Sequence, residues 1–453
     1  MNNIIVEIFY DLVFLIISIF LFRIIQKRQR LNFVNILALS NLSVFPILSL
    51  ISVANGRYIN SFSFVEISRY YLSILLTAIG IFTFNLFVPN SIKNTNEISF
   101  ILNKYIEIPI KKKFLFFISL FLISWFIKVA NGLTAYGSAS ADKLIAMPYY
   151  ITVIKQLSEL LLSGITFIEI SLIIINKHYQ KWLFHFPIIV LTLPVVITSR
   201  AWFLWLFVVV FFMLYWTSKK LNYKKLIKYI PVVLLIFFFL FPLIIGYRTT
   251  MIEIRDEDQY VEGYDLILET FNRLTTKDYN DFELKNKENL SSRASFMEEN
   301  IQLMNYASED PMMGQLFLTS IMFVTPRFLV PNKFDYWGSF SSEIIIGRYY
   351  GINLRDISDN IPLYGYVDLL LPGCLIAGFI IALIIFTCFK ISILWSKRNP
   401  IISISLITTI LVSSFRVESH YIYFFSLFRN IIIIYIILIF INIINNYILH
   451  KSN

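Results

Sequence analysis

Residues 229–258 read YIPVVLLIFFFLFPLIIGYRTTMIEIRDED, and this stretch decides how the chain folds. Its first part is an apolar run that continues to Tyr247, and its second part, from Arg248 onward, is dominated by charged and polar side chains. An apolar run of this length is typical of a helix that crosses a membrane, whereas the charged part needs water. The stretch therefore predicts the point at which a membrane bundle gives way to a large aqueous loop.

The composition of the whole chain agrees with this interpretation. The chain has 453 residues, of which 57% are hydrophobic, 17% aromatic and only 15% charged. A soluble protein of this length could not bury so much apolar surface, so an integral membrane protein is expected. The formal net charge of +10 lies mainly in short loops beside apolar runs. There it reports orientation in the membrane, and nucleic-acid binding is not expected.

Apolar runs long enough to cross a hydrocarbon core recur along the chain. A span needs roughly 17 to 25 residues, and this criterion predicts about eleven spans, within a range of about 10 to 12. The fold class predicted is therefore all-α, a polytopic membrane protein with one large periplasmic loop. The expected spans are 4–22, 32–53, 70–88, 114–130, 150–176, 182–199, 201–217, 229–247, 366–389, 400–415 and 427–447.

The loops between these spans alternate in their content of lysine and arginine. The positive-inside rule assigns the basic loops to the cytoplasm, which places the N-terminus in the periplasm and the C-terminus in the cytoplasm. The chain then has three parts. They are an N-terminal membrane bundle of about eight spans at 1–247, a periplasmic loop at 248–365, and a C-terminal bundle of about three spans at 366–453.

The predicted loop contains two helical segments. Its acidic first half carries an apolar stripe at helical spacing, and Ser291 or Ser292 is a candidate N-cap for that helix. The second segment, Gly314–Val330, is an apolar run broken by Pro326, and a re-entrant half-helix in the outer leaflet is one interpretation of it. The stripe consists of Leu290, Ala294, Met297, Ile301 and Met304.

Arginine, more than lysine, gathers on the predicted outer face. A planar guanidinium suits bidentate binding of phosphate or carboxylate, so an outward-facing anionic ligand is expected. Arg255 and Arg273 lie among acids and are expected to form surface pairs, and Arg200 and Arg248 fit membrane-anchoring residues equally well. The outer arginines are Arg57, Arg69, Arg200, Arg248, Arg255, Arg273, Arg293, Arg327, Arg348, Arg355, Arg416 and Arg429.

Candidates for acid and base chemistry are few. Arg416, Glu418 and His420 lie together in FRVESHY, where a histidine beside a carboxylate can be tuned as a base, and Asp368 follows at the end of the loop. No spacing of Cys or His predicts a metal site. Within the spans, Lys155 and Glu159 are spaced for an ion pair, which would either brace the bundle or line a transport site.

Several of these features together resemble the bacterial O-antigen or oligosaccharide repeat-unit polymerases of the Wzy type. The resemblance rests on the many spans with one large outer loop and on the SSR ending at Arg293. It also rests on the pattern from Gly314 to Lys333 with PR-x-x-x-P-x-K, and on Pro362, Gly365 and Gly373 running into a span. Family members often carry a Glu-containing stretch before the last Gly-rich helix start, where PLYGYVDLLLPG of this chain has none. In this chain Asp368 is the carboxylate nearest that position.

The resemblance implies polymerisation at the periplasmic face of the inner membrane. A glycan on one undecaprenyl diphosphate would be transferred to a repeat unit on another by an inverting, metal-independent glycosyltransferase without a cofactor. The implied catalytic residues are His420, Glu418 and Asp368. The implied residues for the diphosphate and glycan are Arg200, Arg248, Arg293, Arg327, Lys333, Arg348, Arg355 and Arg416.

Two rival functions remain open at this stage. An O-antigen ligase would differ only in its acceptor, and a lipid-linked oligosaccharide flippase would also need a basic cavity. Transporters commonly show internal repeats and midplane binding residues, whereas the arginines of this chain gather at one face. The partners expected for a polymerase are lipid-linked oligosaccharides, membrane lipid, and a chain-length regulator and flippase of the same pathway.

Overall fold

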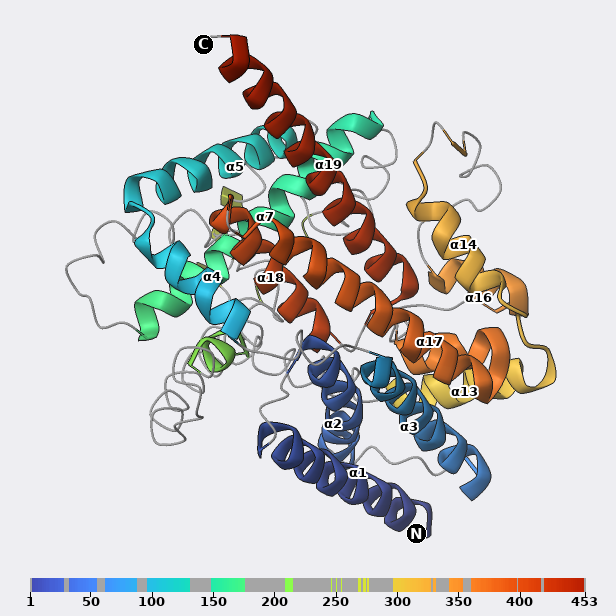
Figure 1. Cartoon of the computed structure of the whole chain (residues 1–453). Coiled ribbons are helices and arrows are strands. Elements are labelled where there is room, and N and C mark those ends of the chain that lie inside the picture. The colour runs from blue at the N-terminus through green and yellow to red at the C-terminus, as the bar shows by residue number, and fades with distance from the viewer. Residues whose placement is uncertain are drawn as a thin grey trace. The chain divides into compact units, whose positions relative to one another are not determined.

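The computed structural model is all-helical in its regular elements (Figure 1). The residues that it describes are 2–27, 32–54, 62–87, 96–130, 148–175, 208–214, 296–326, 329–330, 342–352, 360–396, 398–416 and 419–451, with isolated positions between 246 and 276.

The chain divides into two compact units, each assembled from separate stretches of sequence. Unit 1 comprises Met1–Thr95, Leu290–Ile391 and Ser413–Asn453, and unit 2 comprises Asn96–Asn289 and Ser392–Val412. Unit 1 therefore contains helices from all three parts that were predicted from the sequence, namely the N-terminal bundle, the loop and the C-terminal bundle. The described helices between residues 296 and 350 lie in unit 1, together with helices from both predicted bundles.

Unit 1 contains the helices that matter most for the candidate site. They are α1 (Asn2–Lys27), α2 (Phe33–Ala54), α3 (Phe64–Phe87), α13 (Phe296–Glu309), α14 (Gln315–Val324), α16 (Ser342–Tyr350), α17 (Ile361–Leu394, in this unit up to Ile391) and α19 (Tyr421–Lys451). Unit 2 contains α4 (Asn96–Glu107), α5 (Ile110–Ala130), α7 (Tyr149–Ile175) and α18 (Pro400–Phe415, in this unit up to Val412).

Six of the described helices are long and apolar enough to cross a membrane, which supports a multi-pass membrane protein. They are Ile4–Gln26, Phe33–Ala54, Phe64–Phe84, Tyr150–Leu172, Ile361–Leu394 and Tyr421–Ile444. The expected spans at 114–130 and 400–415 coincide with α5 and α18, which are helices but are not among the six. The expected spans at 182–199 and 229–247 lie almost entirely outside the described residues, as does 201–217 apart from 208–214. The total of about eleven remains a prediction.

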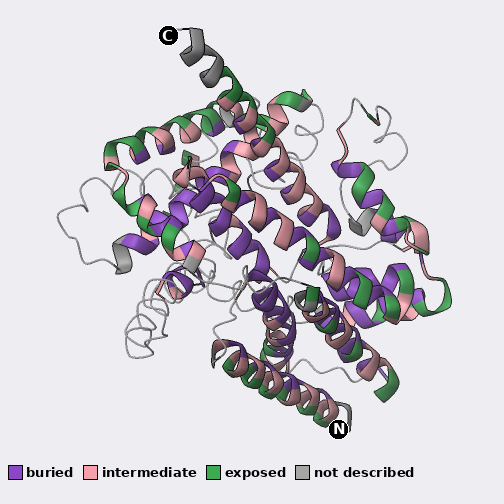
Figure 2. Cartoon of the chain, viewed as in Figure 1, coloured by how far each residue is buried: buried purple, intermediate pink, exposed green. Residues whose placement is uncertain are grey.

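The first helix buries two acidic side chains and exposes several large apolar ones. Its most exposed positions include Ile5, Phe9 and Ile16, whereas Glu7 and Asp11 are buried. Figure 2 shows α1 mostly in the colours of intermediate and exposed residues. A helix at the surface of a soluble protein shows the opposite arrangement. This reversed pattern is what a lipid-facing helix requires, because its apolar face meets hydrocarbon and its polar groups must find protein partners.

Two glycines let α3 and α17 approach each other backbone to backbone. A Cβ added at Gly80 would lie 2.1 Å from the carbonyl oxygen of Leu375, and one added at Gly378 would lie 2.2 Å from that of Thr77. Small residues at such crossings are typical of helix pairs in membranes, where close packing drives association. In unit 2, Gly164 of α7 meets the backbone of Ser405 of α18 in the same way.

The helix α17 is broken near its start. Leu369 (φ −142°, ψ 25°) and Leu370 (φ 57°, ψ −147°) have non-helical dihedral angles, and Pro372 follows them. Proline has no N–H, so the carbonyl oxygen of Asp368 has no donor four residues later. The N–H of Gly314 donates to that oxygen instead, at 3.3 Å, and the N–H of Met312 donates to the oxygen of Val367 at 2.9 Å. The break thus joins α17 to the turn that precedes α14.

The two parts of α17 fold closely against each other at glycine. A Cβ added at Gly373 would lie 2.0 Å from the carbonyl oxygen of Gly365, and one at Gly365 would lie 2.7 Å from Cα of Cys374. The Cys374 thiol lies 3.4 Å from the carbonyl oxygen of Pro362, twelve residues earlier. These contacts require a sharp bend, since residues twelve apart in a straight helix are roughly 18 Å apart.

The helix α13, which comes from the segment predicted to be the outer loop, is anchored on α3. Ser63 and Glu66 form a capping box at the start of α3, and the other oxygen of Glu66 accepts a hydrogen bond from Asn305 of α13. The Arg69 guanidinium donates to Asn305 at 3.2 Å and to Ser308 at 2.7 Å. The predicted stripe is confirmed at Met297, Ile301 and Met304, which are buried, whereas Leu290, Ser291, Ser292 and Ala294 lie outside the described residues.

Candidate functional site

Four of the predicted site residues are described by the structure. They are Asp368, His420, Arg416 and Arg348, and all four lie in unit 1. The other predicted site residues, Glu418, Arg200, Arg248, Arg293, Arg327, Lys333 and Arg355, lie outside the described residues.

The side chain of Asp368, from another helix, caps the N-terminus of α14. The residue that precedes α14, Gly314, has a φ of 87° and no side chain with which to cap it. The carboxylate of Asp368 accepts hydrogen bonds from the N–H of Leu316 at 2.9 Å and of Phe317 at 2.8 Å, one on each oxygen. A negative charge at a helix N-terminus is favoured by the unpaired N–H groups and by the helix dipole. Asp368 therefore has a structural role, and both of its oxygens take part in it.

Arg429 of α19 holds the opposite end of α14. Its Nη1 donates to the carbonyl oxygen of Val324 at 3.2 Å, and Nε and Nη2 donate to Oδ1 of Asn430 at 3.1 and 2.9 Å. A positive charge is favoured at a helix C-terminus, where the last carbonyl groups lack helical partners. The short apolar helix α14 is thus held at both ends by charges of the sign that its dipole favours.

His420 is the N-cap of α19. Its Nδ1 accepts a hydrogen bond from the N–H of Tyr423 at 3.1 Å, which places the proton of the neutral imidazole on Nε2. Burial and the nearby Arg416 lower the pKa of His420 from 6.5 to about 4, so the ring is neutral at pH 7. To accept a proton, this histidine would have to release the cap or change tautomer. Its geometry fits a structural role better than that of a general base.

Arg416 lies between α18 and α19, directly after Phe415 at the end of α18. Its guanidinium lies 4.5 Å from the centre of the Tyr423 ring, and the Tyr423 hydroxyl is 2.8 Å from Ser413 Oγ. Stacking on an aromatic ring fixes the plane of a guanidinium. Arg416 and His420 lie in the link between two helices and not on one helix face, yet they remain close enough to interact electrostatically.

Two buried hydroxyl groups near this link have no hydrogen-bond partner among the described residues. They belong to Tyr364 and Ser419, which are 1% and 2% exposed. The Tyr364 ring lies 5.7 Å from that of Tyr421, the residue that follows His420. Buried polar groups are seldom left unpaired, so these two hydroxyls mark a place where a water or a polar ligand group would be stabilised. No pattern in the sequence singles out either residue.

Arg348 is exposed in the last turn of α16, a helix that packs on α14. The following tyrosines attach α16 to the end of α13. The Tyr349 hydroxyl donates to Oδ1 of Asp310 at 3.2 Å, and the Tyr350 hydroxyl donates to the Asp310 carbonyl oxygen at 3.1 Å. Burial and Tyr349 raise the pKa of Tyr350, so its hydroxyl stays protonated as this donor.

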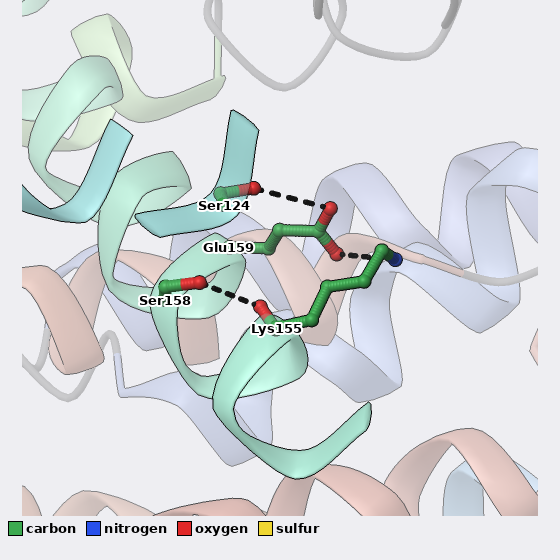
Figure 3. Close-up of polar contacts among 4 residues, drawn as sticks. All are labelled: Ser124, Lys155, Ser158 and Glu159. Carbon is green, nitrogen blue, oxygen red and sulfur yellow. Dashed lines mark hydrogen bonds and ion pairs between the residues drawn. The ribbon is translucent and has the colours of Figure 1, made fainter. Parts of the chain in front are cut away.

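Among the described residues, unit 2 contains three cation–carboxylate pairs, one of which joins Arg273 to Glu269 at 2.9 Å. Lys155 and Glu159 form the predicted ion pair, with 3.2 Å between Nζ and Oε2, and Ser124 donates to the other oxygen of Glu159 at 3.5 Å (Figure 3). Their side chains are 12% and 31% exposed. The ion-pair prediction is therefore confirmed.

A further pair in unit 2 is more deeply buried. Lys113 lies 4.0 Å from Oε1 of Glu169, with exposed fractions of 7% and 1%, and the Tyr105 hydroxyl donates to the same oxygen. Lys113 also lies 4.3 Å from the centre of the Tyr105 ring. Burial and Glu169 raise the pKa of Tyr105 well above its usual value, so the phenol keeps its proton. No pattern in the sequence predicts this pair, because Glu169 lies far from Lys113 and Tyr105 along the chain.

Within the described part of the chain, no group of three or more His, Cys, Asp and Glu side chains converges in a way that would hold a metal ion. The arrangement that the structure does present is an arginine and a neutral histidine in the α18–α19 link, beside a helix clamped by Asp368 and Arg429. No protein-family model, no curated protein and no solved structure matches this chain.

Proposed function

We propose that this protein is a polysaccharide polymerase that joins undecaprenyl-diphosphate-linked oligosaccharides at the periplasmic face of the inner membrane. The observation that carries the proposal is the half-buried Arg416, whose guanidinium lies 4.5 Å from the centre of the Tyr423 ring. A guanidinium has a planar fork of N–H donors that can bind a phosphate in a bidentate way, and the nearby ring restricts its position. The two unpartnered hydroxyls of Tyr364 and Ser419 lie in the same part of unit 1 and would suit a sugar.

In the proposed reaction, a hydroxyl oxygen of the acceptor glycan attacks the anomeric carbon of the donor glycan. The bond between that carbon and the diphosphate oxygen breaks, and undecaprenyl diphosphate leaves with the electron pair. The acceptor hydroxyl proton passes to a base, and the configuration at the anomeric carbon is inverted. Arg416 would stabilise the charge that develops on the leaving diphosphate.

Among the three candidate bases, Glu418 is the one we propose. Both oxygens of Asp368 accept backbone N–H groups, and Nδ1 of His420 caps α19. Glu418 lies outside the described residues, between Arg416 and His420 in the sequence. A base at this position would be close to the proposed diphosphate-binding arginine.

The test compares surface glycan from a deletion strain complemented with wild-type or variant protein. Arg416→Ala is expected to reduce polymer by about 100-fold, and Arg416→Lys to recover little of it, because a lysine cannot bind in a bidentate way. Arg398→Ala is the matched control, since Arg398 also lies over an aromatic ring, 5.9 Å from that of Trp395, but in a loop predicted to be cytoplasmic. The amount of membrane-inserted protein is measured for each variant.

A core bearing a single repeat unit in the deletion strain, with a ladder restored on complementation, would support polymerisation. Loss of the single unit as well would favour an O-antigen ligase or a flippase. A normal ladder from Arg416→Ala at normal protein abundance would remove Arg416 from the site.

A further inference from the structure

The helix α4 and the first turn of α5 form a corner in unit 2 that is held from inside. Tyr105, in the last turn of α4, donates a hydrogen bond to Glu169 of α7, and Lys113 of α5 lies 4.3 Å from the centre of the Tyr105 ring. The N–H groups of Lys112 and Lys113 donate to the carbonyl oxygen of Pro109 at 3.0 and 3.3 Å, so α5 begins directly after the corner. These contacts determine which side chains of the corner are buried and which remain outside.

Three lysines remain outside at this corner, and we call them the corner lysines. Lys111 and Lys112 are exposed at the start of α5. Lys104 of α4 is half-buried, with its Nζ 4.7 Å from the centre of the Phe100 ring. None of the three forms an ion pair with a carboxylate of the described residues, although the exposed Glu107 lies between them in the sequence. Each ammonium group has three N–H donors, so the corner offers a basic surface to an anionic partner.

The same corner exposes large apolar side chains beside the lysines. Phe100 and Ile106 of α4 are 47% and 37% exposed, and Leu115 is exposed one turn after Lys111 on α5. A dissolved phosphate ion would leave these apolar groups in water. A phospholipid has a phosphate directly above its acyl chains, so it can bind the ammonium groups and cover the apolar side chains together. Charge and apolar exposure therefore favour the same partner.

Orientation in the membrane explains why this loop is basic but does not explain the arrangement of its lysines. The positive-inside rule depends on the number of lysines in a loop and does not require them to lie on a fixed surface. In this protein a buried contact between α4, α5 and α7 holds them beside exposed aromatic and aliphatic groups. The loop is among those predicted to be cytoplasmic, and the cytoplasmic leaflet has a negative surface potential.

We propose that α4 and the first turn of α5 form a docking surface for anionic phospholipid headgroups, in which Lys104, Lys111 and Lys112 bind the phosphate groups. The exposed apolar side chains of the corner contact the upper part of the acyl chains. Because Tyr105 connects the corner to Glu169, bound lipid would also hold α4 and α5 against α7. This inference goes beyond the proposed polymerase activity and does not depend on it.

The test is a lipid titration of the purified full-length protein with a fluorescent reporter at the corner. Asn103→Cys, at an exposed polar position of α4, is labelled with an environment-sensitive dye, while Cys374 and Cys388 are buried and should not react. The protein in zwitterionic detergent is titrated with phosphatidylglycerol or with phosphatidylcholine. We expect phosphatidylglycerol to bind more tightly than phosphatidylcholine and to change the fluorescence at lower concentration.

Replacement of the corner lysines by glutamine should remove this preference. Each lysine near an anionic lipid surface contributes about fivefold in affinity, so the triple variant Lys104→Gln/Lys111→Gln/Lys112→Gln should bind phosphatidylglycerol about 100-fold more weakly. Its affinity for phosphatidylcholine should stay unchanged, which also shows that the protein remains folded. The single variant Lys112→Gln should lose about fivefold, and it carries the test if the triple variant is unstable.

The matched control for the single variant is Lys390→Gln, which should leave the titration unchanged. Lys390 also lies near an aromatic ring, 6.0 Å from the centre of that of Phe386, and belongs to a loop predicted to be cytoplasmic, but it is in unit 1. Equal affinities for the two lipids, or equal losses in Lys112→Gln and Lys390→Gln, would overturn the proposal. Displacement of phosphatidylglycerol by inorganic phosphate, but not by chloride at the same ionic strength, would show a site for phosphate ions and would also overturn it.

Discussion

Glu169 in unit 2 and Asp11 in unit 1 are both carboxyl groups that are almost completely buried among apolar helices, yet their surroundings differ. Glu169 has the cation Lys113 at 4.0 Å and a hydrogen bond from Tyr105. Asp11 has hydroxyl donors and a second carboxyl group one turn away. Glu169 can therefore stay ionised beside a cation, whereas the described groups that bind Asp11 are neutral hydroxyls. The difference shows that a buried carboxyl group can be held either by a cation or by neutral hydroxyl groups from neighbouring helices.

Removal of Lys113 from its pair with Glu169 should cause the largest loss in the free energy of unfolding. Lys113→Met leaves Glu169 buried without its cation, and we expect it to lower the free energy of unfolding by about 3–5 kcal/mol. The double variant Lys113→Met/Glu169→Leu should recover most of that loss, because an apolar pair needs no compensation. Thermal unfolding of the purified protein measures both effects. Lys112→Met, at an exposed neighbouring position, is the control and should change little.

Equal losses in the free energy of unfolding for Lys113→Met and Lys112→Met would show that groups other than Lys113 hold Glu169.

The cap formed by Asp368 gives a third way to hold a buried carboxylate, through backbone N–H groups. Asp368→Ala removes both acceptors from the start of α14, and a loss of about 2 kcal/mol in the free energy of unfolding is expected. Asp368→Asn keeps one oxygen and should lose about half as much. The glycan ladder is measured in the same strains. A loss of polymer in Asp368→Asn at unchanged stability would mean that Asp368 acts as the base and not only as a cap.

His420 caps the N-terminus of α19 as a neutral side chain, and the stability that it provides should depend on pH. Its pKa is lowered from 6.5 to about 4 in the folded protein, so the unfolded chain binds the proton more tightly. The stability that neutral His420 provides is complete above pH 6.5 and is lost as the pH falls toward about 4. At pH 7, His420→Ala should lower the free energy of unfolding by about 1 kcal/mol. His420→Asn should lower it less, because asparagine is also a good N-cap residue.

Unfolding midpoints of wild type and His420→Asn, measured between neutral and acidic pH, test this expectation. The variant should lose less stability on acidification. Parallel curves would show that His420 does not lose its cap by protonation.

The smallest effect is expected for the partly exposed pair of Lys155 and Glu159 (Figure 3). Lys155→Met should lower the free energy of unfolding by only about 0.3–0.5 kcal/mol, since water also stabilises both charges. A loss comparable with that of Lys113→Met would mean that the surroundings of Glu159 exclude water as those of Glu169 do. Thermal unfolding of the two variants side by side decides the point.

Much of the fold could be predicted from the sequence because apolar periodicity and span length depend on local composition. The expected spans near the N-terminus, at 366–389 and at 427–447 coincide with α1, α2, α3, α17 and α19. The break in α17 was not predicted, although Pro372 and the glycines around it are the residues that allow it. A break also depends on a partner for the released carbonyl groups, and that partner, the turn at Gly314, comes from elsewhere in the chain.

The candidate site was less predictable for the same reason. The sequence suggested Asp368 and His420 as bases by residue type, but their hydrogen bonds to helix N-termini depend on how distant segments meet. Tyr364 and Ser419 were not singled out, because an unpaired hydroxyl is a property of packing. The ion pair of Lys155 and Glu159 was predictable, since residues four apart on one helix are neighbours whatever the tertiary structure.

The crossing of α3 and α17 has a consequence for how this protein can vary among related sequences. Gly80 and Gly378 each face the backbone of the other helix, so a methyl group at either position would separate both helices at once. Substitutions at the two positions should therefore depend on each other, although almost three hundred residues lie between them. We expect related sequences to keep small residues at both positions or to enlarge one only with a shifted crossing, and that covariation would identify the contact from an alignment alone.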